Sequence, residues 1–459
     1  MSILKFGEER RSSRPLGHRT TLFFNVRAAT IGSVRRVAHK ASWTLLDQCT
    51  VSAGNFLLNV VLARALGQHE YGQFALFLGA IFTLRNIDWS LISFPLSVRL
   101  SASSGDEHAR LLGATALLAT GLGLVLMAVM GLGIGLLGAA NLLLPACLCY
   151  LCWQMQETAR RCLLADFRYR EAVAGDAVAY IGQALVVAAM LKIVPVTLSS
   201  TLYIMSATFA LGALVHAAKL HIAWPKRAEV WQLPREYFSV GKWSLVAYQL
   251  VQLRVQLFPW LLATISGTAA TASLQASYNI ANVMNPVILG IGNAVPQIAA
   301  HAHRAGGIRG AMRTVYGYVL FGLAPILVIC FAGVLMPDPL MRAAYGPASP
   351  YVEAAFCLQL LMVAGVLDYA AEMINKTLLG VQSGRLAFLV NIVALAAALT
   401  LALMLIHPLG LLGACLALLA ANLVRLVIAV ASMIWLIGHD RSRKHAAETS
   451  SADTGANRV

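Results

Sequence analysis

The chain has 459 residues, of which 59% are hydrophobic and only 12% are charged, and its formal net charge is +15. A soluble globular domain carries about 25% charged residues, so this composition excludes a water-soluble enzyme or binding domain. The mean hydropathy is +0.71, and apolar runs recur near the ~20 residues that a helix needs to cross a hydrocarbon core. These runs lack the alternating period of a membrane β-barrel. The sequence therefore predicts an all-α polytopic membrane protein.

Twelve membrane segments are expected from the apolar runs. They are placed at 42–64, 72–98, 111–137, 142–165, 172–192, 199–221, 241–263, 270–300, 314–336, 353–375, 384–406 and 409–438. With the N-terminus inside, 29 of the 35 Lys and Arg residues fall on the cytoplasmic side, which is the asymmetry described by the positive-inside rule. The sequence therefore predicts a multi-pass protein with both termini cytoplasmic. Its basic balance is explained by this topology and by contact with membrane lipids, and no nucleic acid is expected as a partner.

The two sets of six segments look like a repeat. Lys40-Ala-Ser-Trp43 opens the first set and Lys242-Trp243-Ser244 opens the second. A proline is expected to end the second helix of each set, because Pro95 lies 52 residues after Trp43 and Pro296 lies 53 residues after Trp243. Six helices per set give both halves the same orientation, and parallel repeats of this kind hold their substrate at the shared interface. The sequence therefore predicts two parallel six-helix lobes around a central cavity.

Five regions follow from this division. They are a basic cytoplasmic arm at 1–41, an N-lobe at 42–222, a cytoplasmic inter-lobe linker at 223–240, a C-lobe at 241–438 and a disordered cytoplasmic tail at 439–459. The basic arm alternates apolar and basic residues, so it either lies along the membrane surface as an interfacial helix or is disordered.

No motif of an enzyme or of a metal site is present. The sequence has no Walker GxxxxGK[ST], no GxSxG and no HExxH, whose residues would hold phosphate, a nucleophile or zinc. Cys149 and Cys152 form a CxxC inside an apolar segment without a second ligand pair, which is typical of buried structural cysteines. The chain is therefore not expected to be an enzyme, and no metal or cofactor is expected.

Polar side chains gather on the first two segments of each set. At helical spacing they form stripes on one face of a segment. Such stripes either line a wet cavity or join helices by hydrogen bonds, and their occurrence in both halves favours a shared cavity. The stripes are Gln48, Ser52, Asn55 and Asn59 in the first segment, Gln249, Gln252 and Gln256 in the seventh, and Gln275, Tyr278, Asn282, Asn285, Asn293 and Gln297 in the eighth.

One stretch of the first half resembles a known family. The residues are Asp47-Gln48, Ser52-Ala-Gly-Asn55-Phe56, Ala63-Arg64-Ala-Leu-Gly67 and Glu70-Tyr71-Gly72-Gln-Phe74. They resemble the start of polysaccharide flippases, of the O-antigen and exopolysaccharide type, in the multidrug/oligosaccharidyl-lipid/polysaccharide exporter superfamily. Ser277-Tyr278-Asn-Ile-Ala281 through Pro296-Gln297 is similar to a second-lobe helix of that family.

This resemblance implies a twelve-helix, two-lobe flippase of a bacterial cell inner membrane. It implies transport of a polyprenyl-pyrophosphate-linked oligosaccharide from the cytoplasmic to the periplasmic face by alternating access, for surface polysaccharide biosynthesis that supplies exopolysaccharide or lipopolysaccharide. A polysaccharide polymerase and glycosyltransferases are then the expected partners. The long basic N-terminal arm departs from the family, whose chains are expected to begin close to the first helix.

Two arginines are candidates for binding pyrophosphate. Arg85 and Arg254 lie near the middle of segments 2 and 7, where a charge costs at least ~2.5–3.5 kcal/mol to insert. The guanidinium group is always charged and forms a planar fork that fits phosphate oxygens. Arg85 could instead pair with Asp88, and Arg254 points away from the glutamine face of its own segment. The candidates for binding sugar hydroxyls are Asn55, Asn59, Gln252, Asn282 and Asn285.

Carboxylates in the segments are candidates for gating or coupling. Asp368 and Glu372 share one face of segment 10, and Arg425 lies midway along segment 12. These three residues form either a buried ion-pair triad or a site that loads and releases H⁺ or Na⁺ during transport. Asp47, near the cytoplasmic mouth of segment 1, is a candidate for steering or gating, together with Asp88. Glu157 and Asp176 are expected to be solvated or paired with the neighbouring Arg160 and Arg161.

Three other functions compete with the flippase. A cation-coupled exporter of drugs or metabolites has the same two-lobe plan, but organic cations require carboxylates and aromatic side chains, whereas Arg85 and Arg254 favour an anion. A membrane-embedded glycosyltransferase or ligase requires long outer loops, and the longest one expected here covers only 337–351. A scaffold without transport does not explain the charges inside the membrane.

Overall fold

The computed structural model describes residues 43, 46–100 and 103–456, with side chains described as far as His439. The expected basic arm at 1–41 lies outside the described residues. Within them the chain folds into helices and contains no strand. This agrees with a chain in a hydrocarbon environment, where backbone groups must be hydrogen-bonded within their own segment.

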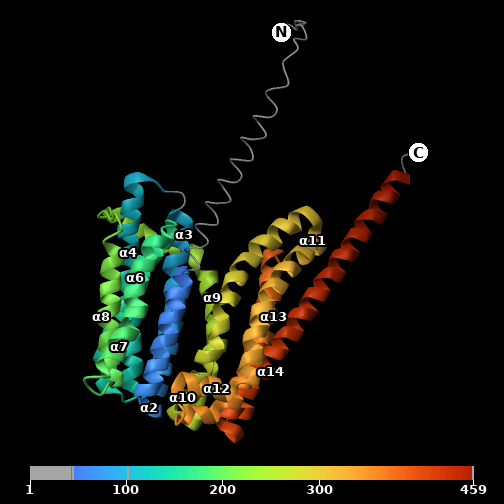
Figure 1. The fold of residues 1–459 in the computed structure, drawn as a ribbon. Coiled ribbons are helices and arrows are strands. Elements are labelled where there is room, and N and C mark those ends of the chain that lie inside the picture. The colour runs from blue at the N-terminus through green and yellow to red at the C-terminus, as the bar shows by residue number, and fades with distance from the viewer. Residues whose placement is uncertain (1–42, 44–45, 101–102, 457–459) are drawn as a thin grey trace, which may run out of the picture.

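The first half of the chain forms a bundle of long helices (Figure 1). Its first described helix covers residues 46–65, and two π-helical segments interrupt later helices. Within the bundle α5 packs against α4 and α8. The helices are α2 (Gln68–Asp88), the π-helical η1 (Trp89–Ser93), α3 (Phe94–Leu100), α4 (Gly105–Leu136), α5 (Ala140–Ala165), α6 (Tyr169–Asp176), the π-helical η2 (Ala177–Ile181), α7 (Gly182–Met190) and α8 (Leu198–Ala217).

The second half contains two very long helices that fold back at glycines. α11 changes direction at Gly306 and Gly307, and α14 does so at Gly410, which has a φ of 54° that favours glycine. Here α13 packs against α11 and α14. The elements are α9 (Arg227–Ser266), α10 (Thr268–Ala281), the 3₁₀ turn η3 (Asn282–Met284), α11 (Asn285–Leu335), α12 (Pro337–Tyr345), the 3₁₀ turn η4 (Pro350–Ala354), α13 (Ala355–Gly380) and α14 (Gly384–Ala456).

The chain is a multi-pass membrane protein. Seven helical stretches within the described residues are long and apolar enough to cross a membrane. Two of them, Thr268–Leu335 and Gly384–His439, contain the glycine breaks and are much longer than one crossing of a ~30 Å core requires. The number of twelve crossings stays a prediction, since length and composition alone do not count a helix that folds back.

The α9 helix lies between the two halves. It packs against α14 of the second half and against α2 and η1 of the first half. At one end of the molecule, the start of α2 lies beside α10 and α12 (Figure 1), and we call this the narrow end. The turn of α11 at Gly306 and Gly307 lies at the opposite end.

Three local expectations differ from the structure. The expected linker at 223–240 is helical from Arg227, because Leu233 and Tyr237 of α9 are buried in an apolar cluster with residues of α3 and α4. Neither Pro95 nor Pro296 ends its helix. Membrane helices accept proline where local π geometry re-pairs the freed carbonyls, and η1 directly precedes the helix that contains Pro95.

The C-terminal tail also differs from the expectation of disorder. α14 continues as a helix to Ala456. Residues 439–456 are rich in alanine and in charged side chains of high helix propensity, and this composition extends a helix that the preceding apolar segment has already nucleated.

Candidate functional site

The two faces of α9 contact different halves of the chain. Its glutamine face lies against α2, where Gln249 donates to the Thr83 carbonyl at 3.3 Å and Gln252 accepts from Asn86 at 3.2 Å. A Cβ on Gly79 would collide with Gln256, so glycine permits this close packing. Arg254 points to the second half, as the helical period predicts. The arginine, and not the glutamine stripe, therefore faces α13 and α14.

Arg254 is held by side chains of two other helices. Its Nη1 donates to Asn422 Oδ1 at 2.9 Å and its Nη2 donates to Asp368 Oδ1 at 3.2 Å. The side chain is 11% exposed, and its Nε atom is buried without a partner. A buried donor without an acceptor costs about 1–3 kcal/mol. The arginine is therefore fixed in direction, and one of its N–H groups is buried without a hydrogen-bond partner.

A second arginine completes the cluster. Arg425 is fully buried and donates to Asp368 at 2.7 Å, and it also makes a short hydrogen bond to Glu372. Lys376 lies 3.5 Å from Glu372 on the same helix. Asp368, Glu372 and Arg425 are therefore paired in the structure, and Arg254 joins the cluster from α9. Three cations oppose two carboxylates, so the cluster carries a net positive formal charge.

Arg254, Asp368 and Asn422 form one wall of a cavity of about 210 Å³. Asn282 and Asn285 are exposed on another wall, and Asn285 donates to Asn282 at 3.1 Å. The cavity is lined by Arg254, Val255, Phe258, Tyr278, Ala281, Asn282, Met284, Asn285, Ile288, Leu361, Gly365, Asp368, Leu418 and Asn422.

A break in a membrane helix presents the two asparagines. The 3₁₀ turn Asn282–Met284 separates α10 from α11, and Pro286 follows at the start of α11. Discontinuous helices in transporters place polar groups in this manner near bound substrate. The structure thus brings together four of the predicted residues, Arg254, Asp368, Asn282 and Asn285, in one cavity.

A second charged cluster lies in the first half and centres on Arg160. This side chain lies 2.5 Å from Asp47, 2.6 Å from Asp176 and 3.5 Å from Glu157. Arg161 lies 2.6 Å from Glu157 and stacks over Trp89. The carboxylates are therefore paired, as expected for Glu157 and Asp176, and they are buried, not solvated. Asp47 joins the first helix to this cluster and is itself 4% exposed.

The alternative considered for Arg85, a pair with Asp88, is not formed. Arg85 instead approaches Glu157 at 3.8 Å and leaves 36% of its side chain exposed. Asp88 accepts from Gln154 at 2.6 Å and from Ser93 at 3.4 Å. The reason is that Asp88 is buried on the side of α2 that faces α5, where the Gln154 amide donates a hydrogen bond to it.

Three predicted sugar-binding residues lie away from the cavity. Asn59 is buried, and its Oδ1 accepts from Tyr71 and Gln275, both at 3.2 Å. Asn55 is half-buried on the same helix, and the Oε1 of Gln252 is occupied by Asn86. Among the stripes, that of the first segment therefore joins helices, whereas that of the eighth segment reaches the cavity.

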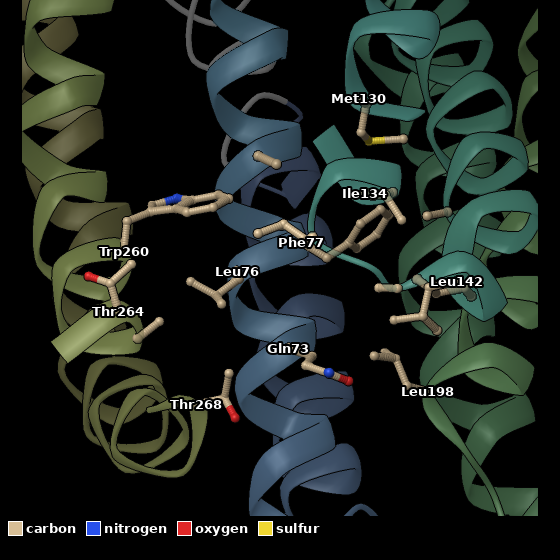
Figure 2. A pocket seen from close by; sticks show the side chains of 16 residues that line it. Gln73, Leu76, Phe77, Met130, Ile134, Leu142, Leu198, Trp260, Thr264 and Thr268 are labelled. Carbon is tan, nitrogen blue, oxygen red and sulfur yellow. The ribbon is translucent and has the colours of Figure 1, made fainter. Parts of the chain in front are cut away.

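A different cavity, of about 300 Å³, lies beside the narrow end. Figure 2 shows Leu76 and Phe77 of α2 between Trp260 and Thr264 on one side and Leu142 and its neighbours on the other. Its lining is apolar apart from the side chains of Gln73, Thr264, Thr268 and the Trp260 indole N–H. It contains no cation, so it does not fit a charged phosphate group.

Sequence reasoning missed Asn422 and Gln154. Asn422 lies three residues before Arg425 and so shares its helix face, which is a signal that could have placed it beside the same carboxylates. Gln154 lies three residues before Glu157 in the same way. Both are short amides inside apolar segments, where a polar group requires a partner.

Comparison with known proteins shows the fold. No protein-family model matches the sequence, and no curated protein matches it. An inward-facing multidrug resistance MATE family transporter of the MOP superfamily is similar, with 16% identity over 90% of this chain and 96% of that chain and a TM-score of 0.64. The Lipid II flippase MurJ, in an inward closed conformation, has 12% identity over 85% of this chain and 87% of that chain, with a TM-score of 0.66.

A MOP superfamily transporter from Pyrococcus furiosus is also similar. It has 14% identity over 87% of this chain and 94% of that chain, with a TM-score of 0.63. The similar proteins include both multidrug transporters and a lipid flippase, so the common feature is the architecture and not the substrate. The chain therefore has the helical fold of the MOP superfamily transporters.

Proposed function

We propose that this protein is a flippase that moves a polyprenyl-pyrophosphate-linked oligosaccharide across the membrane by alternating access. The fold is that of transporters, one of which is described as a lipid II flippase. The proposal includes a bacterial inner membrane, cytoplasmic termini and transport toward the periplasmic face for surface polysaccharide biosynthesis. A polysaccharide polymerase and glycosyltransferases are its proposed partners.

The observation that carries this proposal is the wall of the 210 Å³ cavity. Arg254 is held on this wall by Asn422 and Asp368, and its Nε atom has no partner. An anion that enters can accept from the side-chain amides of Asn282 and Asn285, and from the Arg254 N–H after a rotation of that side chain exposes it to the cavity. In a cavity of low dielectric, such charge-assisted hydrogen bonds are about twice as strong as neutral ones.

Arg85 is the proposed second cation. It is partly exposed, and at 3.8 Å its contact with Glu157 is a loose one. Because Glu157 is already paired at 2.6 Å with Arg161, Arg85 can leave this carboxylate at little cost. The pyrophosphate would then bind between one arginine of each half, while the lipid chain stays in the membrane.

The alternative function is a cation-coupled multidrug or metabolite exporter. One observation favours it: Asp368 is 31% exposed at a cavity that also contains Tyr278, and a carboxylate beside an aromatic ring suits an organic cation. The net positive charge of the cluster opposes this alternative, since three cations surround two carboxylates.

Expression in a flippase-null bacterial strain tests the proposal. Wild type, Arg254→Ala, Arg85→Ala and a matched control, Arg385→Ala, are compared at equal protein level, with surface polysaccharide as the readout. Arg385 is exposed and lies outside both clusters. We expect wild type and Arg385→Ala to restore the polysaccharide, and Arg254→Ala to reduce it at least tenfold, which corresponds to about 1.4 kcal/mol.

The same strains separate the two functions. If wild type fails with several donor glycans and instead raises resistance to cationic drugs, the exporter replaces the flippase. If Arg254→Ala restores polysaccharide as well as Arg385→Ala does, the cavity is not the pyrophosphate site.

A further inference from the structure

The segment that joins the first helix to α2 lies at the narrow end and contacts the second half of the chain. It contains Arg64, in the last turn of the first helix, and Gly67, the N-cap residue of α2. Tyr71 and Gly72 follow in the first turn of α2. The cavity and the charged clusters use none of these residues.

Arg64 binds the end of a helix almost 300 residues away in sequence. Its Nε donates to the Ala344 carbonyl and its Nη2 donates to the Ala343 carbonyl, both at 2.7 Å. These carbonyls belong to the last turn of α12, where helix carbonyls lack partners within the helix and carry a partial negative charge. The arginine therefore caps α12 and ties it to the first helix.

At the same end of the molecule, α2 packs closely against α10. A Cβ on Gly72 would collide with the Thr268 carbonyl oxygen, so residue 72 must lack a side chain for this contact to form. His69 of α2 is hydrogen-bonded to the Thr268 hydroxyl at 2.6 Å. Gln275 of α10 donates to Asn59 of the first helix.

Buried aromatic rings pack together at the same contact between the two halves. Tyr71 is fully buried, and its ring lies 5.7 Å from that of Tyr351, which in turn lies 5.5 Å from that of Tyr345. Tyr345 also donates to the Ala276 carbonyl at 2.8 Å. The narrow end is therefore closed by a buried layer of rings and amides, with Arg64 outside it.

The two layers differ in exposure. Arg64 is exposed to solvent and forms its bonds with backbone atoms alone, whereas the tyrosines are buried. An exposed contact of a charged side chain contributes little to stability because water and salt compete for it. A contact of this kind can hold one conformation and still break in each cycle, as a gate requires.

We propose that Arg64 is the releasable latch of the gate at the narrow end. While it caps α12, the two halves stay together there, and release of the two carbonyls lets α12 and α10 move away from the first helix and α2. This inference rests on the proposed transport by alternating access and deepens it, since it names the residue that regulates one of the two gates.

Thiol labelling of purified full-length protein, without substrate, tests the latch. The reporter is Ala272→Cys, because Ala272 is completely buried and lies one helical turn from Thr268. The exposed Cys49 and the half-buried Cys147, Cys152 and Cys330 are replaced by serine in every protein. A maleimide then reacts with the reporter only when the narrow end opens.

Two latch variants and one control are compared in this background. We expect Arg64→Ala to raise the labelling rate of the reporter about fivefold, the change that the loss of one weak, exposed contact of a charged side chain produces. Arg64→Lys keeps the charge but reaches one carbonyl instead of two, so its rate is expected between those of Arg64→Ala and the unsubstituted latch. Arg342→Ala is the matched control, because Arg342 is exposed on α12, and it should leave the rate unchanged.

The buried native cysteines Cys149 and Cys415 report general loosening of each half. Faster labelling of the reporter alone, in Arg64→Ala but not in Arg342→Ala, supports the latch. Equal reporter rates in these two proteins overturn it. If Arg64→Ala speeds labelling of the reporter, Cys149 and Cys415 alike, the latch is overturned as well, unless Arg64→Lys speeds labelling of the reporter alone. Since no substrate is present, the latch can fail while the flippase proposal stands, and the reverse also holds.

Discussion

The two halves of the chain each bury a cluster of charges, but the clusters differ in what surrounds them. In the first half, Arg160 is enclosed by Asp47, Glu157 and Asp176 within 3.5 Å. In the second half, Arg254 and Arg425 share Asp368, and the cluster opens onto a cavity. The first arrangement uses its arginine entirely for internal pairing. The second leaves an arginine N–H without a partner.

The charge balance of the clusters also differs. Arg85, Arg160 and Arg161 stand against four carboxylates, since Asp88 adds to the three that surround Arg160. The second cluster has three cations and two carboxylates. The second cluster therefore carries the charge that suits an anion, whereas the first cluster is negative overall and holds the partly exposed Arg85 beside Glu157.

The largest expected effect of a single substitution is on the stability of the first cluster. Arg160→Ala would leave Asp47 and Asp176 buried without their cation, and breaking a buried pair in this way costs about 3–5 kcal/mol. Arg254→Ala should cost less, about 1–3 kcal/mol, because Asp368 keeps Arg425 at 2.7 Å. Unfolding of purified protein in mixed micelles measures both values.

Two outcomes of this measurement bear on the comparison between the halves. A larger loss for Arg160→Ala, together with full loss of transport only for Arg254→Ala among the folded proteins, supports a structural first cluster and a functional second one. Equal losses of stability would mean that Arg254 is also a structural residue, and the two clusters would then not differ in role.

Much of the helical architecture could be predicted from hydropathy. The segment expected at 142–165 is α5, and that expected at 199–221 begins within one residue of α8. The period of 100° per residue placed Arg254 opposite the glutamines of its helix, and the spacing of four placed Asp368 and Glu372 together. These are properties of a single helix, which its own sequence determines.

Contacts between helices were not predictable in the same way. Whether Arg85 pairs with Asp88 or with Glu157 depends on how α2 is rotated against α5, and the structure selects Glu157. The pairing of Arg160 with Asp47 joins residues that are 113 positions apart. The asparagine stripe of the first helix resembles that of the eighth segment in spacing, yet Asn59 binds Tyr71 and Gln275 whereas Asn282 faces a cavity.

A smaller effect is expected from the carboxylates of the second cluster. Asp368→Asn and Glu372→Gln preserve shape and remove one negative charge each, so H⁺ or Na⁺ can no longer be exchanged at that position. If this cluster couples transport to an ion, the variants lose the dependence on proton or sodium gradient while they still bind substrate. Transport into proteoliposomes with and without each gradient measures this dependence. An unchanged gradient dependence in both variants would assign the carboxylates to ion pairing alone.

The smallest expected effect concerns a partly exposed carboxylate outside the membrane segments. The backbone N–H of Lys226 donates to Glu229 at 2.8 Å, and Arg110 of α4 donates to it at 3.2 Å. These contacts, the backbone hydrogen bond first, lower the pKa of Glu229 below its ordinary value. Because the folded-state pKa is lower than that of the unfolded chain, the stabilisation is present above the ordinary glutamate pKa and is lost as the pH falls through the lowered one.

Glu229→Gln should therefore lower the thermal midpoint slightly at pH 7, and the difference from wild type should shrink as acid protonates the carboxylate. A difference that stays constant down to low pH would show that the contact acts through packing of α4 against α9. The charge of Glu229 would then add nothing to stability, and the contrast with the buried clusters would be larger still.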